Sequence, residues 1–177
     1  EKDLEKDTIV VFLSDNGGAP YTMSNNKPLK GNKYCEAEGG VRIPILISWP
    51  GKLPTGKSQG ALVSAMDIYP TLVEAAGGRP HAKLDGKSLN PLLTGKSQAD
   101  NHNFLVLSRG AKNGDYVVRS GDWKLRVCKT PRLFTVGRHY EYDDVTGSFL
   151  YNLKDDLSES KNLFQTSPER AARLQTY

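Results

Sequence analysis

The sequence predicts an α/β chain that begins with a buried strand and ends with a small antiparallel sheet. Residues 8–13, "TIVVFL", form a β-branched and aromatic run, which is typical of a strand buried on both faces inside a parallel sheet. Residues 64–78, "SAMDIYPTLVEAAGG", contain the clearest helix. The second half alternates short apolar segments with Gly or Asp turns, which favours an antiparallel sheet.

Length and composition limit the classes of protein to consider. The chain has 177 residues, enough for one domain with a hydrophobic core but too few for two large ones. The formal net charge is +4, and no run of five or six basic residues occurs, so the sequence does not indicate a nucleic-acid partner. No apolar stretch approaches the roughly 20 residues that span a membrane, so no membrane partner is expected either.

A long loop and a second strand follow the first strand. Residues 14–40 are rich in Gly, Asn and Pro and show no periodicity. Loops of this length are commonly functional or disordered. Residues 41–51, "VRIPILISWPG", predict a strand in which Pro44 marks an edge, a bulge or the strand start.

The remaining elements carry recognisable boundary residues. Asp67 is expected to cap the helix that follows it, and Gly77 is expected to end that helix. Gly121-Asp122 lies between two apolar runs and predicts a hairpin turn. Ser167 and Pro168 predict the start of a last helix. The predicted strands of the second half are "NFLVLSR", "YVVRS", "DWKLRV" and "SFLYNL".

Asp15 and Asn16 come directly after the first predicted strand. Ligands of open α/β sheets bind beyond the carboxyl ends of the strands. Carboxylate and carboxamide oxygens suit Ca²⁺ or Mg²⁺. The same two residues are also common turn formers, so a cation site and a simple turn both remain open from the residues alone.

Further along the loop, charged residues flank glycines. Lys30 and Lys33, in "PLKGNK", could hold an oxyanion or lie solvated on the surface. Glu38 and Arg42, in "EGGVRIP", could form an ion pair that fixes the loop or contact a ligand, and the ion pair is favoured.

Other common catalytic signatures are absent from the sequence. The two cysteines, Cys35 and Cys128, form no CxxC motif, and either a single disulfide or two unrelated thiols is possible. None of the three histidines has the spacing of a zinc pair. Neither a GxSxG nor a P-loop motif occurs.

The order of seven segments resembles the C-terminal part of the sulfatase family, the formylglycine-dependent group of the alkaline phosphatase superfamily. The resemblance runs from about residue 8 to about residue 165, and no single segment would be specific by itself. The segments are "SDNGG", "PLKGNK", "EGGVRIPILISWPG", "VSAMDIYPTLVEAAG", "LDGKSLNPLLTG", "VRSGDWKL" and "LYNLKDDLSESKNL".

The resemblance implies a fold in two parts. Residues 1–100 would be the C-terminal segment of the catalytic domain, containing the last strands of the large sheet of an alkaline-phosphatase-like sandwich. Residues 101–177 would be a small subdomain with a four-stranded antiparallel sheet and a packed helix.

The resemblance also implies site residues. Asp15 and Asn16 match two ligands of the family's divalent cation, usually calcium. Lys33 matches the catalytic lysine that contacts sulfate, and Lys30 lies at a family arginine position and is a further substrate-binding candidate. The "YCEA" segment after Lys33 departs from the family's usual small residues.

Three more residues are candidates for substrate contacts, and one segment fails as a nucleophile. In the family the C-terminal subdomain helps to choose the substrate, so His102, Arg109 or Arg138 could contribute. The family's formylglycine arises from a cysteine or serine in a C/S-x-P-x-R motif. The segment "CKTPR", which begins at Cys128, has one residue too many between Cys and Pro and lies after the metal pair rather than before it.

The resemblance therefore implies a fragment of a larger enzyme. The nucleophile, a catalytic histidine and two further acidic ligands would belong to a missing N-terminal part, which is the expected intramolecular partner. The fragment alone is expected to be inactive, and the parent is expected to be exported. Its substrate would be a sulfated small molecule or carbohydrate.

Two other functions stay open at this point. One is a phosphonate or phosphate monoester hydrolase of the same superfamily, which would share the metal pair. The other is a non-catalytic module that binds sulfated glycans through its basic loops and would show salt-sensitive heparin binding. The sequence specifies neither the substrate, nor an exo or endo mode, nor the oligomeric state.

Overall fold

The computed structural model describes residues 4–108, 114–129, 132–136, 139–143 and 146–177. Backbone contacts divide the chain into two compact units. The first combines Glu1–Leu13 with Pro44–Asn103, and the second combines Ser14–Ile43 with Phe104–Tyr177. The long loop therefore groups with the C-terminal sheet, whereas the motif order assigned it to the segment that ends at residue 100.

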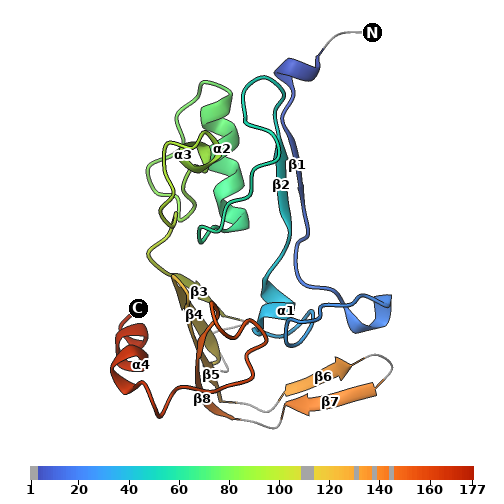
Figure 1. Cartoon of the computed structure of the whole chain (residues 1–177), viewed down its shortest axis with the longest axis vertical. Coiled ribbons are helices and arrows are strands. Elements are labelled where there is room, and N and C mark those ends of the chain that lie inside the picture. The colour runs from blue at the N-terminus through green and yellow to red at the C-terminus, as the bar shows by residue number, and fades with distance from the viewer. Residues whose placement is uncertain (1–3, 109–113, 130–131, 137–138, 144–145) are drawn as a thin grey trace. The chain divides into compact units, whose positions relative to one another are not determined.

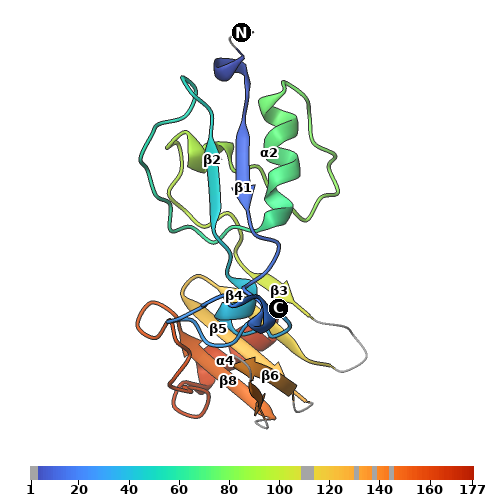
Figure 2. The ribbon, with the colours of Figure 1, turned by 90° about the vertical axis from the view of Figure 1, so that its right-hand side faces the viewer.

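The first unit is a strand pair covered on one side by helices (Figures 1 and 2). Strands β1 (Val10–Leu13) and β2 (Ile45–Ser48) pair in antiparallel orientation. The chain then forms the helical segments η3 (Ala65–Asp67), α2 (Ile68–Ala75) and α3 (Asn90–Leu93). Helix α2 ends as predicted, because Gly77 adopts a positive φ of 79° just beyond it. A short 3-10 helix, η1 (Glu5–Asp7), precedes β1.

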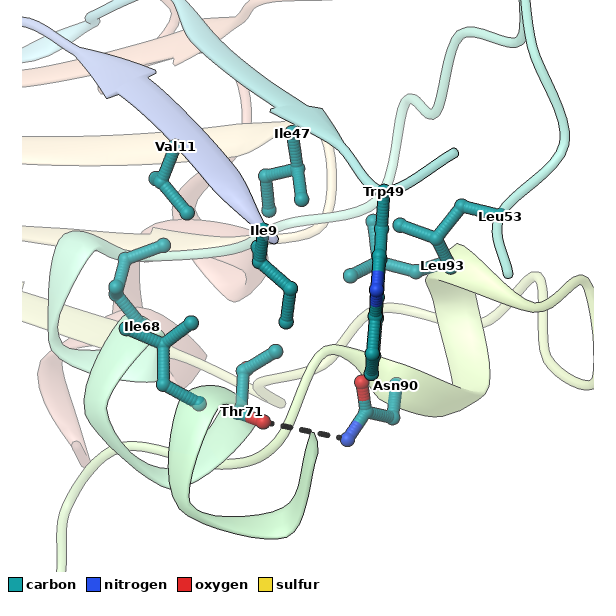
Figure 3. Close-up of a pocket in the computed structure, with 10 residues that line it drawn as sticks. Ile9, Val11, Ile47, Trp49, Leu53, Ile68, Thr71, Asn90 and Leu93 are labelled. Carbon is teal, nitrogen blue, oxygen red and sulfur yellow. Dashed lines mark hydrogen bonds between the residues drawn. The ribbon is translucent and has the colours of Figure 1, made fainter. Parts of the chain in front are cut away.

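The inner face of the strand pair forms the core of this unit. Strand and helix side chains enclose a small cavity that no charged residue lines (Figure 3). Its only polar wall is formed by Thr71 and Asn90, where the Asn90 amide donates to the Thr71 carbonyl at 3.4 Å. The Trp49 indole closes one side and donates to the Lys6 carbonyl at 2.9 Å. This cavity belongs to the hydrophobic core and offers no group for catalysis.

The outer face of the same strand pair is exposed within the described part of the chain. Val10, Phe12 and Leu46 are 57%, 66% and 59% exposed. Within the described residues β1 pairs with the antiparallel β2 and is covered on one face, so the expected burial on both faces in a parallel sheet is not seen in this part of the fold and stays a prediction.

The second unit contains the predicted four-stranded antiparallel sheet. Its spatial order is β3-β4-β5-β8, and helix α4 (Pro168–Gln175) contacts β4 and β5 (Figure 1). The β4–β5 hairpin turns at Gly121, whose φ is 53°. The strands are β3 (Leu105–Leu107), β4 (Tyr116–Ser120), β5 (Trp123–Cys128) and β8 (Gly147–Asn152).

The core of this unit joins the sheet to α4. Ala171 and Leu174 are three residues apart, so they lie on one face of the helix. They pack against Val118, Leu125 and Leu150 from three neighbouring strands. All five side chains are at most 2% exposed, which confirms the predicted helix-on-sheet arrangement.

Several short elements were not predicted. Strands β6 (Arg132–Val136) and β7 (His139–Asp143) form a separate two-stranded sheet. The long loop contains η2 (Pro20–Thr22) and a single helical turn, α1 (Glu38–Val41). Because α1 occupies the expected start of the second strand, β2 begins only at Ile45, directly after Pro44. No helix in the described part of the chain is long and apolar enough to cross a membrane.

Candidate functional site

The loop of residues 14–43 is held together by glycines in backbone contact. The Gly17 N–H donates to the Gly40 carbonyl at 2.9 Å. A Cβ atom on Gly17 would lie 1.7 Å from the Gly39 carbonyl oxygen, and one on Gly39 would lie 2.3 Å from the Gly31 carbonyl oxygen. These distances are far below contact, so side chains are excluded where the segments meet.

Residues 30–33 complete this packing. The Gly39 N–H donates to the Lys30 carbonyl at 2.7 Å, and the Lys33 N–H donates to the Gly18 carbonyl at 3.1 Å. The loop therefore brings the segment that follows Asp15 directly against the segment that carries Lys33. We call residues 14–18, 30–33 and 37–42 together the glycine-packed loop.

Asn26 joins two of these segments, and sequence reasoning missed it. Its side-chain oxygen accepts the Gly18 N–H at 2.9 Å, and its amide donates to the carbonyls of Gly18 and Gly31 at 3.0 and 3.3 Å. Asn side chains commonly bond nearby backbone in turns, so an Asn within a glycine-rich loop was the available signal.

Asp15 and Asn16 lie at one edge of the glycine-packed loop. Asp15 is exposed and Asn16 is half-buried, and the Ser14 hydroxyl donates to the Asn16 carbonyl at 2.7 Å. Within the described residues, neither the Asp15 carboxylate nor the Asn16 carboxamide has a hydrogen-bond or ion-pair partner. Two such hard oxygen donors are the type that Ca²⁺ prefers, so the donor chemistry fits a calcium ion.

The described residues do not surround Asp15 and Asn16 with a fuller set of metal-binding side chains. They contain no group of three or more His, Cys, Asp or Glu side chains that could hold a metal. Calcium takes about six to eight oxygen ligands. Asp15 and Asn16 could therefore supply a minority of the ligands, as the family resemblance implies.

Lys33 is half-buried beside an aromatic pair. Its ammonium lies 5.4 Å from the centroid of the Tyr34 ring, and the Tyr34 hydroxyl is 3.2 Å from the Tyr21 hydroxyl. Tyr34 has a φ of 80°, which is costly for a residue with a side chain. Lys30 is exposed, and its carbonyl rather than its ammonium fixes the loop.

His102 lies in the first unit, whereas Asp15, Asn16, Lys30 and Lys33 lie in the second. Its side chain is buried, and its Nε2 atom is 2.7 Å from a carboxylate oxygen of Asp67. This placement favours a structural role, and a substrate contact by His102 stays a prediction. Arg109 and Arg138 lie outside the described residues.

The Asp67 carboxylate does not make the helix cap that the sequence predicts. Asp67 stands at the N-cap position of α2, but its carboxylate does not bond the α2 backbone. It accepts the Ser64 N–H at 2.9 Å and the Lys87 N–H at 2.8 Å, in addition to its contact with His102. The fully buried carboxylate thus joins three separate segments of the first unit.

Glu38 and Arg42 form the expected ion pair, with 3.4 Å between Arg42 Nη1 and Glu38 Oε2. Two further cations on the sheet also reach Glu38: Lys124 at 2.9 Å and Arg119 at 3.5 Å. Burial would raise the pKa of the Glu38 carboxyl, but these cations, Lys124 foremost, outweigh burial and lower the pKa. Sequence reasoning missed both Lys124 and Arg119.

Both cysteines are buried thiols. The Asn32 N–H donates to the Cys35 sulfur at 3.3 Å. Burial raises the pKa of the Cys35 thiol, although backbone N–H groups and nearby cations act against it. A buried thiol with a raised pKa is poorly nucleophilic, so Cys35 serves packing.

The amino-acid sequence of this chain is similar to those of known sulfatases. A family model described as Sulfatase matches residues 1–78. A sulfatase from Formosa agariphila is 34% identical and matches 94% of this chain, and arylsulfatase A from Bos taurus is 32% identical and matches 93%. The chain spans only about a third of these relatives, 30% and 35% of their lengths.

Solved structures agree with the sequence matches. The crystal structure of Ps i-CgsB superposes on 96% of this chain with a TM-score of 0.76 and 29% identity, covering 35% of that protein. The same protein was also solved in complex with k-i-k-neocarrahexaose. The order of motifs, the fold and these relatives lead to one conclusion: the chain belongs to the sulfatase family.

Proposed function

We propose that this chain supplies part of the cation site and a sulfate-binding lysine to a sulfatase that hydrolyses sulfate esters. The observation that carries the proposal is the hydrogen bond from the Lys33 N–H to the Gly18 carbonyl within the glycine-packed loop. It holds the segment that carries Asp15 and Asn16 against the segment that carries Lys33. The named sulfatases among the relatives support this assignment.

Each residue has a distinct role in this proposal. Asp15 and Asn16 would hold a divalent cation, for which Ca²⁺ fits the oxygen donors best. When bound, that cation supplies positive charge beside the sulfate oxygens. The Lys33 ammonium would bind a sulfate oxygen and stabilise the negative charge that develops there, and the exposed Lys30 would contact substrate further out.

The nucleophile would come from another part of the same protein. Formylglycine supplies the attacking oxygen in the family that this chain resembles, and this sequence holds no C/S-x-P-x-R motif from which it could form. Cys128, the nearest candidate, is only 4% exposed. The chain alone is therefore expected to be inactive, and export of the whole enzyme remains a prediction.

A sulfated carbohydrate is the proposed substrate class. The support is that Ps i-CgsB, which shares this fold at 29% identity, was solved in complex with an oligosaccharide, k-i-k-neocarrahexaose. The segment 27–33 also carries Lys27, Lys30 and Lys33 without an acidic residue, which suits an anionic substrate.

The test uses the full-length sulfatase that contains this chain, with a chromogenic aryl sulfate and a sulfated oligosaccharide. Lys33→Ala is expected to lower kcat/KM by roughly 10²-fold, the usual effect of removing one charge-stabilising donor. Asp15→Ala and Asn16→Ala are expected to raise the Ca²⁺ concentration that gives half-maximal activity. Lys57→Ala, at an exposed position in the first unit, serves as the control and should leave both values unchanged.

Two outcomes would contradict the proposal. Hydrolysis of phosphate monoesters or phosphonates without hydrolysis of sulfate esters would assign the loop to another reaction of the superfamily. Wild-type activity in Lys33→Ala, together with salt-sensitive heparin binding by the chain, would instead favour a non-catalytic glycan-binding module.

A further inference from the structure

Lys124 is a buried cation that pairs with two carboxylates, Glu38 in the glycine-packed loop and Glu159 in the segment after β8. It lies on β5 and is 1% exposed. Its ammonium is 2.9 Å from Glu38 Oε1 and 3.0 Å from Glu159 Oε1. A buried ammonium is tolerated only when it is paired, so these two contacts fix where both carboxylates can lie.

Glu159 supports the same arrangement from a strained position. It has a φ of 53°, an uncommon value for a residue with a side chain, and its side chain is 1% exposed. Its second carboxylate oxygen accepts the Glu38 N–H at 2.6 Å. Glu159 therefore binds both Lys124 and the backbone at the start of α1. Strain of this kind persists only where the surroundings enforce it.

Glu38 links this buried cluster to the candidate site. The two residues that follow it, Gly39 and Gly40, make the backbone bonds to Lys30 and Gly17 described above. A Cβ atom would not fit at Gly17, Gly39 or Gly40, so the backbone segments are already in close contact and one cannot move without displacing the others. A displacement of Glu38 would consequently move the segments that carry Asp15 and Lys33.

We propose that Lys124 is a positioning residue of the sulfatase site, acting through Glu38 and together with Glu159 to hold the glycine-packed loop in place. The proposal rests on the function proposed above. Lys124 touches neither cation nor substrate in this scheme. Its ion pairs hold α1 in position. The position of α1 in turn determines the distance between the Asp15–Asn16 segment and the segment that carries Lys33.

The test compares variants of the full-length sulfatase. Lys124→Met removes the charge at similar length, Lys124→Arg keeps the charge, and Lys154→Met removes an exposed lysine of the same unit as a control. We expect Lys124→Met to raise the half-saturating Ca²⁺ concentration at least tenfold and to lower kcat even at saturating substrate. We expect Lys124→Arg to recover part of both losses and Lys154→Met to behave as wild type.

Hydrogen exchange gives a readout that does not depend on catalysis. Peptides covering residues 14–43 should exchange faster in Lys124→Met than in Lys154→Met, whereas peptides from α2 should be unchanged. If Lys124→Met does not fold, Glu159→Gln, which keeps the side chain's shape, replaces it in every measurement.

The outcomes separate this inference from the function on which it rests. If the melting temperature falls while calcium dependence, kcat and loop exchange stay at wild-type values, Lys124 is merely structural and the inference is wrong. If the wild-type enzyme hydrolyses no sulfate ester, the proposed function fails. In that case unchanged exchange of residues 14–43 in Lys124→Met would refute the positioning role separately.

Discussion

Asp156 shows how one carboxylate holds a turn in place. Its oxygens accept the N–H groups of Ser160 and Lys161 at 3.0 and 2.8 Å and the Ser158 hydroxyl at 3.0 Å. Burial acts to raise the pKa of Asp156, but these donors prevail and lower it to about 2. The turn they form carries Glu159 in its strained conformation.

Asp156→Asn is expected to destabilise the protein in a pH-dependent way. The folded pKa of about 2 lies below the unfolded value of about 3.9, so the stabilisation is complete above about pH 4 and is lost as the pH falls through 2. We expect about 1 kcal/mol at pH 7, discounted because the carboxylate is partly solvated. Melting temperatures of wild type and variant between pH 7 and pH 2 measure this difference. A gap that does not narrow in acid would contradict the assignment, and Asp122→Asn, in an exposed turn, is the control.

At the scale of elements, buried side chains tie loops to helices. The Asp67 carboxylate joins η3, the segment at Lys87 and the segment at His102. Gly86 closes this junction, because a Cβ atom there would lie 2.1 Å from the Met66 carbonyl oxygen. The long connections of the first unit are thus ordered by one carboxylate rather than by regular secondary structure.

Asp67→Asn is expected to destabilise the protein by roughly 3 kcal/mol, because it removes the charge from a buried, fully bonded site and points an N–H₂ group at other donors. Denaturant unfolding of the full-length enzyme measures the loss. Asp85→Asn, at an exposed position nearby in the sequence, should change stability by less than about 0.5 kcal/mol. Similar effects of the two substitutions would show that the Asp67 contacts do not stabilise the fold.

Sequence reasoning succeeded where the signal is local. Gly121 in its turn, Gly77 after α2 and Pro168 at the start of α4 each dictate the conformation of their own neighbourhood. It missed β6 and β7, because "RLFTV" and "HYEYD" mix polar and apolar residues without a clear strand pattern.

The candidate site was predicted only in part for a related reason. Motif order proposes Asp15, Asn16 and Lys33 as site residues, which stays a prediction, and the contacts that arrange their segments join residues far apart in the chain. The bond from Lys124 to Glu38 spans 86 residues, and that from Glu38 to Glu159 spans 121. No local sequence pattern indicates which buried charged side chains will contact each other, so these contacts can be identified only from the folded structure.

At the scale of the whole molecule, the chain holds two folded units and, in our proposal, only part of a cation site. Asp15 and Asn16 offer three side-chain oxygens from two residues, and the described residues contain no group of three or more His, Cys, Asp or Glu side chains that could hold a metal. We therefore expect the isolated chain to bind Ca²⁺ no more tightly than millimolar and to turn over no aryl sulfate.

Calorimetry and a chromogenic assay test this expectation directly. The isolated chain is titrated with CaCl₂ and then incubated with an aryl sulfate, with the full-length enzyme as the positive control. Micromolar calcium binding, or turnover by the isolated chain, would show that it holds a complete site.

The glycine-packed loop also determines what a saturation-mutagenesis screen of the enzyme would record. Gly17, Gly39 and Gly40 leave no room for a methyl group, so almost every replacement there should score as severely as the loss of Asp15. The tolerance of each position in this loop to substitution would then reflect how closely its backbone is packed, rather than whether its side chain takes part in the reaction. Shape-matched pairs, such as Asp15→Asn and Lys33→Met, change chemistry at constant volume, and their scores would distinguish the ligands from the scaffold.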